Sequence, residues 1–194
     1  MNGVTITMSA NKRTLWESTK VTLPIIGEVS AFEAMEFIAS SCKSMVSESY
    51  KVPMPKLVFT LRQRATPNIK LAENIHFDYG GLFHFPDAHH NNCKKINISL
   101  NYKYNDLTKL ATTDLTTPDG DELLHSMMSM ICHELIHAKQ FLAGELSTSE
   151  GDYVWNGERV SIDTPYMDQP HEIEAHDGMD YYAQHMMAFI QDRS

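Results

Sequence analysis

The sequence predicts an α+β fold, and three observations support this class. Short segments rich in β-branched and aromatic residues occur between positions 4 and 104. Longer segments at 31–48, 119–143 and 170–191 carry apolar residues at helical spacing. The 194 residues are enough for one hydrophobic core, and neither an internal repeat nor a low-complexity stretch divides them. We therefore expect one domain over residues 1–194.

The N-terminal part is predicted to form two short strands and a helix. Val4–Met8 and Lys20–Ile26 have strand-like composition, whereas the polar segment Asn11–Ser18 between them predicts a loop or turn. Ser30 precedes the first helical period as an N-cap, and Glu33 occupies the capping-box position three residues later. The amphipathic helix that follows is expected to be scaffold.

The middle of the chain is predicted to supply further strands. Lys56–Leu61 is a strand by composition, and Ile75–Phe85 alternates on either side of Gly80-Gly81, which predicts a hairpin. Lys95–Tyr104 shows the clearest alternation in the chain, with apolar and polar residues on opposite faces. We therefore expect Lys95–Tyr104 to be a strand with one buried face.

The helix predicted at 119–143 has two different faces. Asp119 and Asp121 favour its start at the positive end of the helix dipole, and Gly144 favours its end. One face is an apolar stripe made of Leu124, Met128, Ile131, Leu135 and Leu142. His133 and His137 project nearly opposite that stripe, on a side shared with Ser126, Ser129 and Gln140. The histidine face is therefore expected to line a polar cleft.

A hairpin and a final helix are predicted after that helix. Glu145–Asp152 is expected to be a loop. Tyr153–Trp155 and Glu158–Ile162 flank Asn156-Gly157, which suits a type I′ turn. Pro170 is well placed to begin the final helix.

The long helix carries the pattern His133-Glu134-x-x-His137. Residues four apart lie on the same face of a helix, so both imidazoles can direct a nitrogen at one point, as a tetrahedral Zn²⁺ requires. Glu134 lies about 100° round the helix from His133 and can reach a water on that metal. Zinc makes such a water far more acidic than bulk water, and a neighbouring carboxylate can accept its proton. The pattern therefore predicts two zinc ligands and a general base.

A third ligand is expected on the final helix, because a catalytic zinc site has three protein ligands and one open position. The inward apolar stripe of that helix meets Glu172 when it is extended back one turn, and His176 lies at its margin. Glu174 sits off the stripe, and Asp177 projects toward solvent. An acid on an apolar face is costly unless it is paired or binds metal. We therefore favour Glu172 among these four candidates, with His176 as a neighbour that orients a ligand or stabilises an oxyanion.

These residues resemble the gluzincin type of zinc metallopeptidase, in which the His-Glu-x-x-His pattern is followed by a glutamate on a later helix. The segment Pro170–Ala175 is similar to the Glu-x-Glu-Ala segment of ImmA/IrrE-like peptidases and to a Pro-x-Glu-x-Glu-Ala pattern in short phage-encoded proteins of the metallopeptidase type. In that pattern the first glutamate, here Glu172, is the ligand. The order of elements from Lys95 to Ala188 resembles the minimal core of SprT-like proteins, which implies a small sheet packed on the motif helix.

The resemblance covers about the C-terminal half of the chain and has clear departures. SprT-like proteins often use a histidine as third ligand and carry a four-cysteine ribbon, which this chain lacks. Thermolysin-like enzymes place an acid four residues after the ligand glutamate, and His176 occupies that place here. The resemblance therefore implies a zinc-dependent metallopeptidase that acts on a protein or peptide, without naming the substrate.

Two further roles are assigned on this basis. Tyr166 and His176 are the candidates for the donor that stabilises the scissile carbonyl as it becomes an oxyanion. By analogy, Lys95–Tyr104 is expected to be an edge strand that binds substrate as an added strand.

Composition limits the partners and the location. The net charge of −9 argues against a broad nucleic-acid interface, although Lys51–Lys70 concentrates Lys51, Lys56, Arg62, Arg64 and Lys70, for which a solvated strand and loop is the preferred interpretation. No apolar segment is long enough to span a bilayer, and Met1–Ala10 has no secretory signal pattern. We therefore expect a cytoplasmic protein, in the host cytoplasm if the chain is phage-encoded.

Other histidines and cysteines give weaker metal signals. His89 and His90 lie in the polar loop 86–92, where solvated side chains are a simpler interpretation than a second metal site. Cys42, Cys93 and Cys132 include no C-x-x-C pair, so a disulfide framework and a four-cysteine ribbon are not expected. Cys132 points away from His133, which favours a buried structural role.

Two alternatives to a peptidase remain from the sequence. The first is a non-catalytic, metallopeptidase-like zinc protein, in which Cys132 or His176 closes a four-coordinate site for folding or partner binding. The second is a metal-dependent nuclease or other hydrolase with the same ligands. The acidic charge and the presence of Glu134 argue against the second alternative.

Overall fold

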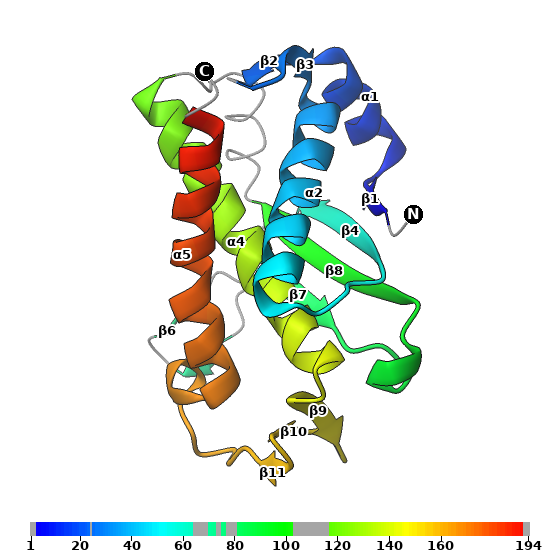
Figure 1. Cartoon of the computed structure of the whole chain (residues 1–194), viewed down its shortest axis with the longest axis vertical. Coiled ribbons are helices and arrows are strands. Elements are labelled where there is room, and N and C mark those ends of the chain that lie inside the picture. The colour runs from blue at the N-terminus through cyan, green and yellow to red at the C-terminus, as the bar shows by residue number, and fades with distance from the viewer. Residues whose placement is uncertain are drawn as a thin grey trace.

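The computed structural model describes residues 3–23, 25–63, 70–72, 75–76, 81–102 and 117–191. The helices of this part are α1 (Ala10–Ser18), α2 (Ala31–Tyr50), α4 (Pro118–Leu142) and α5 (Pro170–Gln191), with 3-10 turns η1 (His90–Asn92) and η2 (Tyr166–Asp168). The strands are β1 (Val4–Thr7), β2 (Lys20–Leu23), β3 (Gly27–Ser30), β4 (Lys56–Gln63), β5 (Lys70–Ala72), β6 (Ile75–His76), β7 (Gly81–His84), β8 (Lys95–Tyr102), β9 (Leu146–Ser149), β10 (Asp152–Trp155) and β11 (Glu158–Arg159). The protein is α+β, as predicted (Figure 1).

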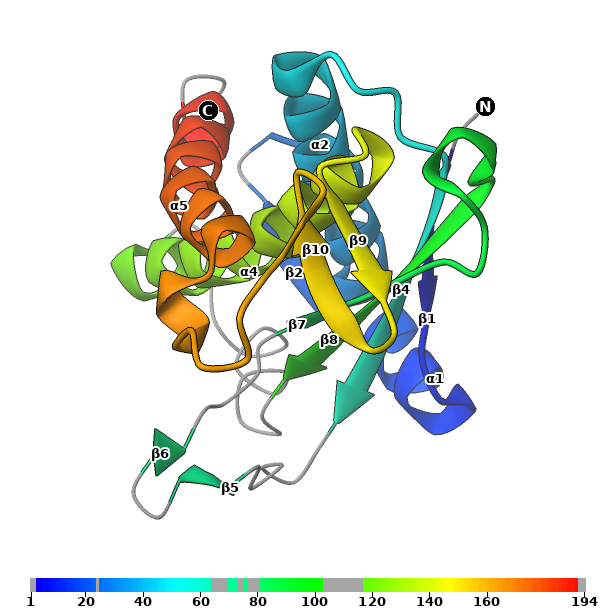
Figure 2. The same cartoon turned by 90° about the horizontal axis from the view of Figure 1, so that it is seen from below.

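A four-stranded mixed sheet in the order β1-β4-β8-β7 supports the rest of the fold. Strands β1, β4 and β8 are parallel, and β7 runs antiparallel to β8. The apolar face predicted for β8 is confirmed, because Ile96, Ile98 and Leu100 are fully buried and pair with Leu57, Phe59 and Leu61 of β4. On the opposite face, which was expected to be polar, Ser99 is buried as well. Helices α2 and α4 pack on this sheet, and α5 packs along α4 (Figures 1 and 2).

Local chemistry sets the ends of the long helices. The capping box before α2 is confirmed: Ser30 Oγ accepts the Glu33 N–H at 3.2 Å, and Glu33 Oε2 accepts the Ser30 N–H at 2.8 Å. Helix α4 begins after Thr117, whose Oγ1 accepts the N–H of Gly120 at 3.3 Å. It ends just before Gly144, which has a φ of +77° that favours glycine.

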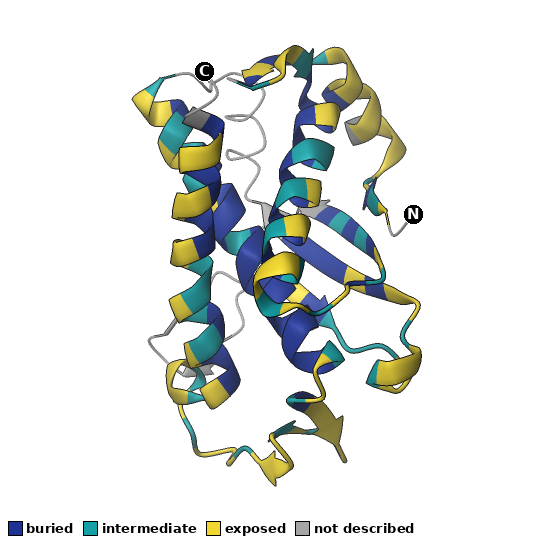
Figure 3. Ribbon diagram, viewed as in Figure 1, coloured by how far each residue is buried: buried dark blue, intermediate teal, exposed yellow. Residues whose placement is uncertain are grey.

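Helix α4 is the central element, and its second half is buried on every side (Figure 3). Helix α5 approaches it closely at Gly178, where a Cβ atom would lie 2.6 Å from Ile136 Cδ1. The hydroxyl of Tyr182 donates a 2.7 Å hydrogen bond to Ser49 Oγ and so ties α5 to α2. This close packing holds the first turns of α5, which include Glu172, over the motif in α4.

A small sheet in the order β11-β10-β9 follows α4. The hairpin predicted around Asn156-Gly157 is confirmed: Trp155 pairs with Glu158, and the two turn residues have φ values of +50° and +86°. Both positive φ values are what a type I′ turn requires. The expectation that the whole of 145–152 is a loop is wrong, because β9 pairs with β10.

Three other expectations, all for the part of the chain that precedes α4, are wrong. Segment 10–18 is a helix, because packing buries Trp16 and a tertiary contact outweighs the polar composition. The hairpin around Gly80-Gly81 is not supported, since β6 pairs with β5 and β7 pairs with β8, while Gly80 lies outside the described residues. Strand β8 is not an edge strand, because β4 and β7 flank it.

The helices of the described part do not reach the length and apolarity that a membrane span needs.

Candidate metal centre

Two histidines of α4 point toward each other on the side that faces α5. The rings of His133 and His137 meet edge-to-face at 4.7 Å, and their Nε2 atoms lie 3.1 Å apart. Both side chains are buried, and the polar cleft expected on this face is present in part, because Ser126, Ser129 and His133 border a cavity. Helix α5 covers the rest of the histidine face, where His137 and Gln140 are buried.

Glu172 brings the third ligand atom from α5. Its Oε2 lies 3.3 Å from His133 Nε2 and 3.4 Å from His137 Nε2. Ligand atoms of a tetrahedral zinc with bonds of 2.0–2.1 Å stand about 3.3 Å apart. The three atoms therefore already have the spacing of three corners of such a site, and the described part of the chain offers no other group of three potential ligands.

The electrostatics of this cluster favour a cation. Burial alone raises the pKa of Glu172, but its contacts with His133 and His137 and a hydrogen bond from Tyr166 hold that pKa well below its usual range. Burial lowers the pKa of His133. Two buried atoms, His133 Nδ1 and Glu172 Oε2, have no hydrogen-bond partner among the described residues. A carboxylate and two imidazoles are a donor set that suits Zn²⁺.

Glu134 lies beside the cluster under strand β7. It is almost completely buried, its Oε2 has no hydrogen-bond partner among the described residues, and burial raises its pKa to about 7. The Phe83 N–H of β7 donates to this carboxylate and opposes that rise. Gly81 makes room for it, because a Cβ atom there would lie 2.4 Å from Glu134 Oε1. The carboxylate is thus held next to the ligands with an oxygen left free to accept a proton.

This raised pKa predicts a pH-dependent cost of stability in the metal-free protein. A carboxyl group with a pKa of 4.5 when unfolded and about 7 when folded stabilises the fold at low pH and loses that contribution as the pH rises through 7. Glu134→Gln removes the cost of ionising this buried carboxyl group. When the stability difference between the two metal-free proteins at pH 4.5 is taken as the reference, the variant should gain up to about 3 kcal/mol over wild type at pH 8. Urea unfolding of the chelator-treated proteins at both pH values measures this change.

The exposed residue Glu158 provides the control for that experiment. Glu158→Gln should leave the pH dependence of unfolding unchanged. A stability difference between wild type and Glu134→Gln that is the same at both pH values would contradict the prediction.

A cavity of about 530 Å³ lies next to the cluster. It is bordered by α4, α5, η2 and the start of β7, and its lining includes Met130, His133, Glu134, Tyr166, His176 and Met179. The cavity reaches His133 and Glu134 together, so a molecule bound there would meet a ligand histidine and the free carboxylate.

Tyr166 and His176, the two predicted oxyanion donors, both border the cavity. The hydroxyl of Tyr166 donates a hydrogen bond to Glu172, so in this arrangement it supports the ligand carboxylate. The ring of His176 lies 4.8 Å from that of His133, and its buried Nε2 has no partner among the described residues. Of the two, His176 has the atom that is available for a substrate oxygen or a metal.

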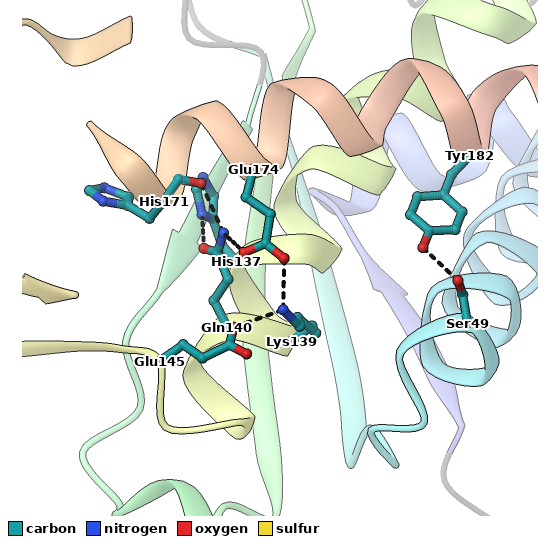
Figure 4. Close-up of polar contacts among 8 residues, drawn as sticks. All are labelled: Ser49, His137, Lys139, Gln140, Glu145, His171, Glu174 and Tyr182. Carbon is teal, nitrogen blue, oxygen red and sulfur yellow. Dashed lines mark hydrogen bonds and ion pairs between the residues drawn. The ribbon is translucent and has the colours of Figure 1, made fainter. Parts of the chain in front are cut away.

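The remaining candidates for the third ligand have other positions. Glu174 Oε1 accepts a 2.7 Å hydrogen bond from Lys139, and its Oε2 accepts one from Gln140 at 3.0 Å (Figure 4). Asp177 is exposed. Cys132 is buried and contacts Cys42 of α2, and their interaction and burial raise the pKa of the Cys42 thiol. The geometry therefore agrees with the prediction that Glu172 is the third ligand.

Sequence reasoning missed three residues that surround the ligands. Gln140 bonds to the ligand His137 and to Glu174, and Lys139 bonds to Glu174. His171 is almost fully buried against Tyr153 and Trp155, and its Nε2 lies 3.6 Å from Glu172 Oε1. Burial lowers the pKa of His171 to about 4, so it is neutral at physiological pH. Of these three residues, only Gln140 gave a signal in the sequence, because its hydrogen-bonding side chain lies on the histidine face of the helix.

The other predicted clusters form no such group. His89 is exposed and its ring stacks on that of His90 at 3.9 Å. Neither joins a group of three potential ligands in the described part of the chain. Lys51 and Lys56 are exposed, whereas the side chains of Arg62, Arg64 and Lys70 lie outside the described residues.

No protein-family model, curated protein or solved structure matches the chain. The assignment of the metal centre therefore depends on its geometry.

Proposed function

We propose that this protein is a zinc-dependent metallopeptidase of the gluzincin type. His133, His137 and Glu172 would hold Zn²⁺, and the observation that carries the proposal is the spacing of 3.1–3.4 Å between their three ligand atoms. Zinc bound there would supply a Lewis acid that acidifies water and polarises a peptide carbonyl. Glu134 borders the cavity and has one carboxylate oxygen without a partner among the described residues, and it would accept a proton from that water and return it to the leaving amine.

Other groups would bind and orient the peptide. His176 is proposed as the oxyanion donor, and Tyr166 as a support for Glu172 that can also reach the cavity. In the described part of the chain β7 ends the sheet, so we propose that β7, rather than β8, presents backbone groups to an extended peptide. The acidic net charge agrees with a protein or peptide substrate rather than nucleic acid, and we propose a cytoplasmic location.

The test of this proposal is hydrolysis of a mixed peptide library by the zinc-loaded protein, read by mass spectrometry. Cleavage that stops on chelation, returns with zinc and is lost in Glu134→Gln supports a peptidase. If the protein binds zinc but cleaves no peptide, the metal site is supported and the catalytic role is refuted.

A non-catalytic zinc protein is the second candidate, and one observation favours it. His176 Nε2 has no partner in the described part of the chain, belongs to a ring 4.8 Å from that of His133, and could close the fourth position. The optical spectrum of the Co²⁺-substituted protein separates the two: a spectrum that changes in His176→Leu but not on addition of a competing anion indicates a closed site.

Gly81→Ala tests the proposed position of Glu134 without changing a charged group. The added methyl would overlap Glu134 Oε1, so the carboxylate must move away from β7. A displacement of about 1 Å at a reacting group can cost on the order of 100-fold in rate. We expect peptide hydrolysis to fall by that amount while zinc content stays at the wild-type level.

Gly3→Ala is the matched control, because no atom of the described residues lies within 4 Å of its added Cβ. Equal rates for Gly81→Ala and Gly3→Ala would mean that the position of Glu134 does not matter to the reaction.

A further inference from the structure

Gln140 is the only fully buried polar side chain that bonds to a ligand histidine in the described part of the chain. Its Oε1 lies 2.8 Å from His137 Nδ1. Its Nε2 lies 2.9 Å from the carbonyl oxygen of His171 and 3.0 Å from Glu174 Oε2 (Figure 4). The amide thus connects the motif helix α4 to the first turns of α5.

The partners of Gln140 determine which way its amide faces. A backbone carbonyl and a carboxylate can only accept hydrogen bonds, so the atom that faces His171 O and Glu174 must be the NH₂ group. The opposite atom, Oε1, can only accept. His137 Nδ1 must therefore carry a hydrogen and donate it, which leaves Nε2 with a free lone pair in the neutral ring. That Nε2 is the atom that faces Glu172.

Glu174 is itself held in place by a charge. Lys139 is buried, lies 2.7 Å from Glu174 Oε1 and 2.7 Å from Glu145 Oε2, and stacks over the ring of Tyr50 at 4.3 Å. Burial lowers the pKa of Lys139, but the two carboxylates outweigh burial and raise it, so the ammonium stays charged. This ion pair holds the Glu174 side chain in place and directed at Gln140.

The other ligand histidine lacks such a partner. His133 Nδ1 is buried and makes no hydrogen bond with any described residue. With His137 Nε2 unprotonated, the 3.1 Å contact between the two Nε2 atoms is satisfied when His133 carries the hydrogen. The two histidines are therefore not equivalent before metal binds.

We infer that Gln140, oriented by Glu174 and the His171 carbonyl, is a positioning residue that keeps His137 in the tautomer with a free Nε2 lone pair. One ligand of the site is thus prepared in the metal-free protein, and His133 must give up its Nε2 hydrogen when metal arrives. This inference rests on the metal site of the proposed function and does not depend on peptide hydrolysis.

The tautomers can be read directly in long-range ¹H–¹⁵N spectra of the metal-free protein, recorded at a pH where the imidazoles are neutral. The expected pattern is a hydrogen on Nδ1 of His137 and on Nε2 of His133. In Gln140→Leu the His137 pattern should shift toward the other tautomer. A hydrogen on Nε2 of His137 in the wild type would overturn the inference.

Zinc affinity gives the second measurement, made by competition with a chromophoric chelator. Loss of a hydrogen bond behind a metal-bound histidine typically weakens binding 10–100-fold, and we expect this loss in Gln140→Leu. The control is Gln184→Leu, because Gln184 is exposed on α5. Equal affinities in the two variants would overturn the inference, provided that the circular dichroism of both shows a folded protein.

A reciprocal exchange distinguishes positioning from simple packing. Gln140→Glu keeps an acceptor for His137 but sets a second carboxylate against Glu174, so zinc binding and apo stability should both fall. Adding Glu174→Gln supplies an amide donor to the new carboxylate and should recover part of the zinc affinity, although the His171 carbonyl loses its donor. No recovery in the double variant would count against the role of Glu174. If the wild type fails to bind zinc, the proposed function fails, while the tautomer spectra still decide the role of Gln140.

Discussion

Glu172→Ala should leave the purified protein without stoichiometric zinc, whereas the wild type holds about one zinc per chain. The variant removes one of three converging ligand atoms, and two histidines alone hold zinc weakly. Residues behind the ligands change affinity by about 10–100-fold, so loss of a ligand should exceed that range. Elemental analysis after dialysis, together with chelator competition, measures the change.

Two acids on the same helix provide controls for this experiment. Asp177→Ala alters an exposed side chain and should bind zinc like the wild type. Glu174→Ala removes the acceptor for Gln140 and Lys139, so it should retain zinc with an affinity that falls by no more than about 100-fold. Retention of tight zinc binding in Glu172→Ala would place the third ligand elsewhere and break the gluzincin comparison. Absence of zinc from the wild type would refute the metal site.

Glu134→Gln should remove peptide hydrolysis while zinc content is unchanged. The amide has the same shape but cannot accept a proton, and loss of a general base costs about 10²–10⁴-fold in rate. Glu134 contributes no atom to the ligand triangle, so zinc affinity should stay close to that of the wild type. The rate is measured on the best peptide from the library with zinc-loaded protein, at equal metal occupancy.

Glu134→Asp extends this test to position as well as chemistry. It keeps the carboxylate but draws it back from the ligands by one methylene, so its rate should lie between those of the wild type and Glu134→Gln. Hydrolysis that survives in Glu134→Gln at the wild-type rate would require another base. That result would indicate that Glu134 is not the general base of the metal site.

Close agreement between sequence and structure is found where local chemistry decides the conformation. The capping box of Ser30 and Glu33, the Asn156-Gly157 turn and the start of α5 at Pro170 all depend on residues a few positions apart. The His-Glu-x-x-His motif belongs to the same class, because helical geometry alone brings His133 and His137 together.

Segments whose neighbours are distant in the chain were predicted less well. The helix at 10–18 depends on the burial of Trp16, and the pairing of β7 with β8 depends on strands that composition cannot order. The same is true of Gly81, since no local signal tells that its missing side chain makes room for Glu134.

The sequence by itself determined the motif helix and the approach of its two histidines, because these follow from spacing along one helix. It also favoured Glu172, since an acid on an apolar stripe needs a partner. Only the tertiary structure decided that Glu174 serves Gln140 and Lys139, and that His137 has a supported tautomer while His133 does not. The physical reason is that these roles arise from hydrogen bonds between α4 and α5, whose relative rotation is set by packing at Gly178 and Ile136 and not by any local pattern.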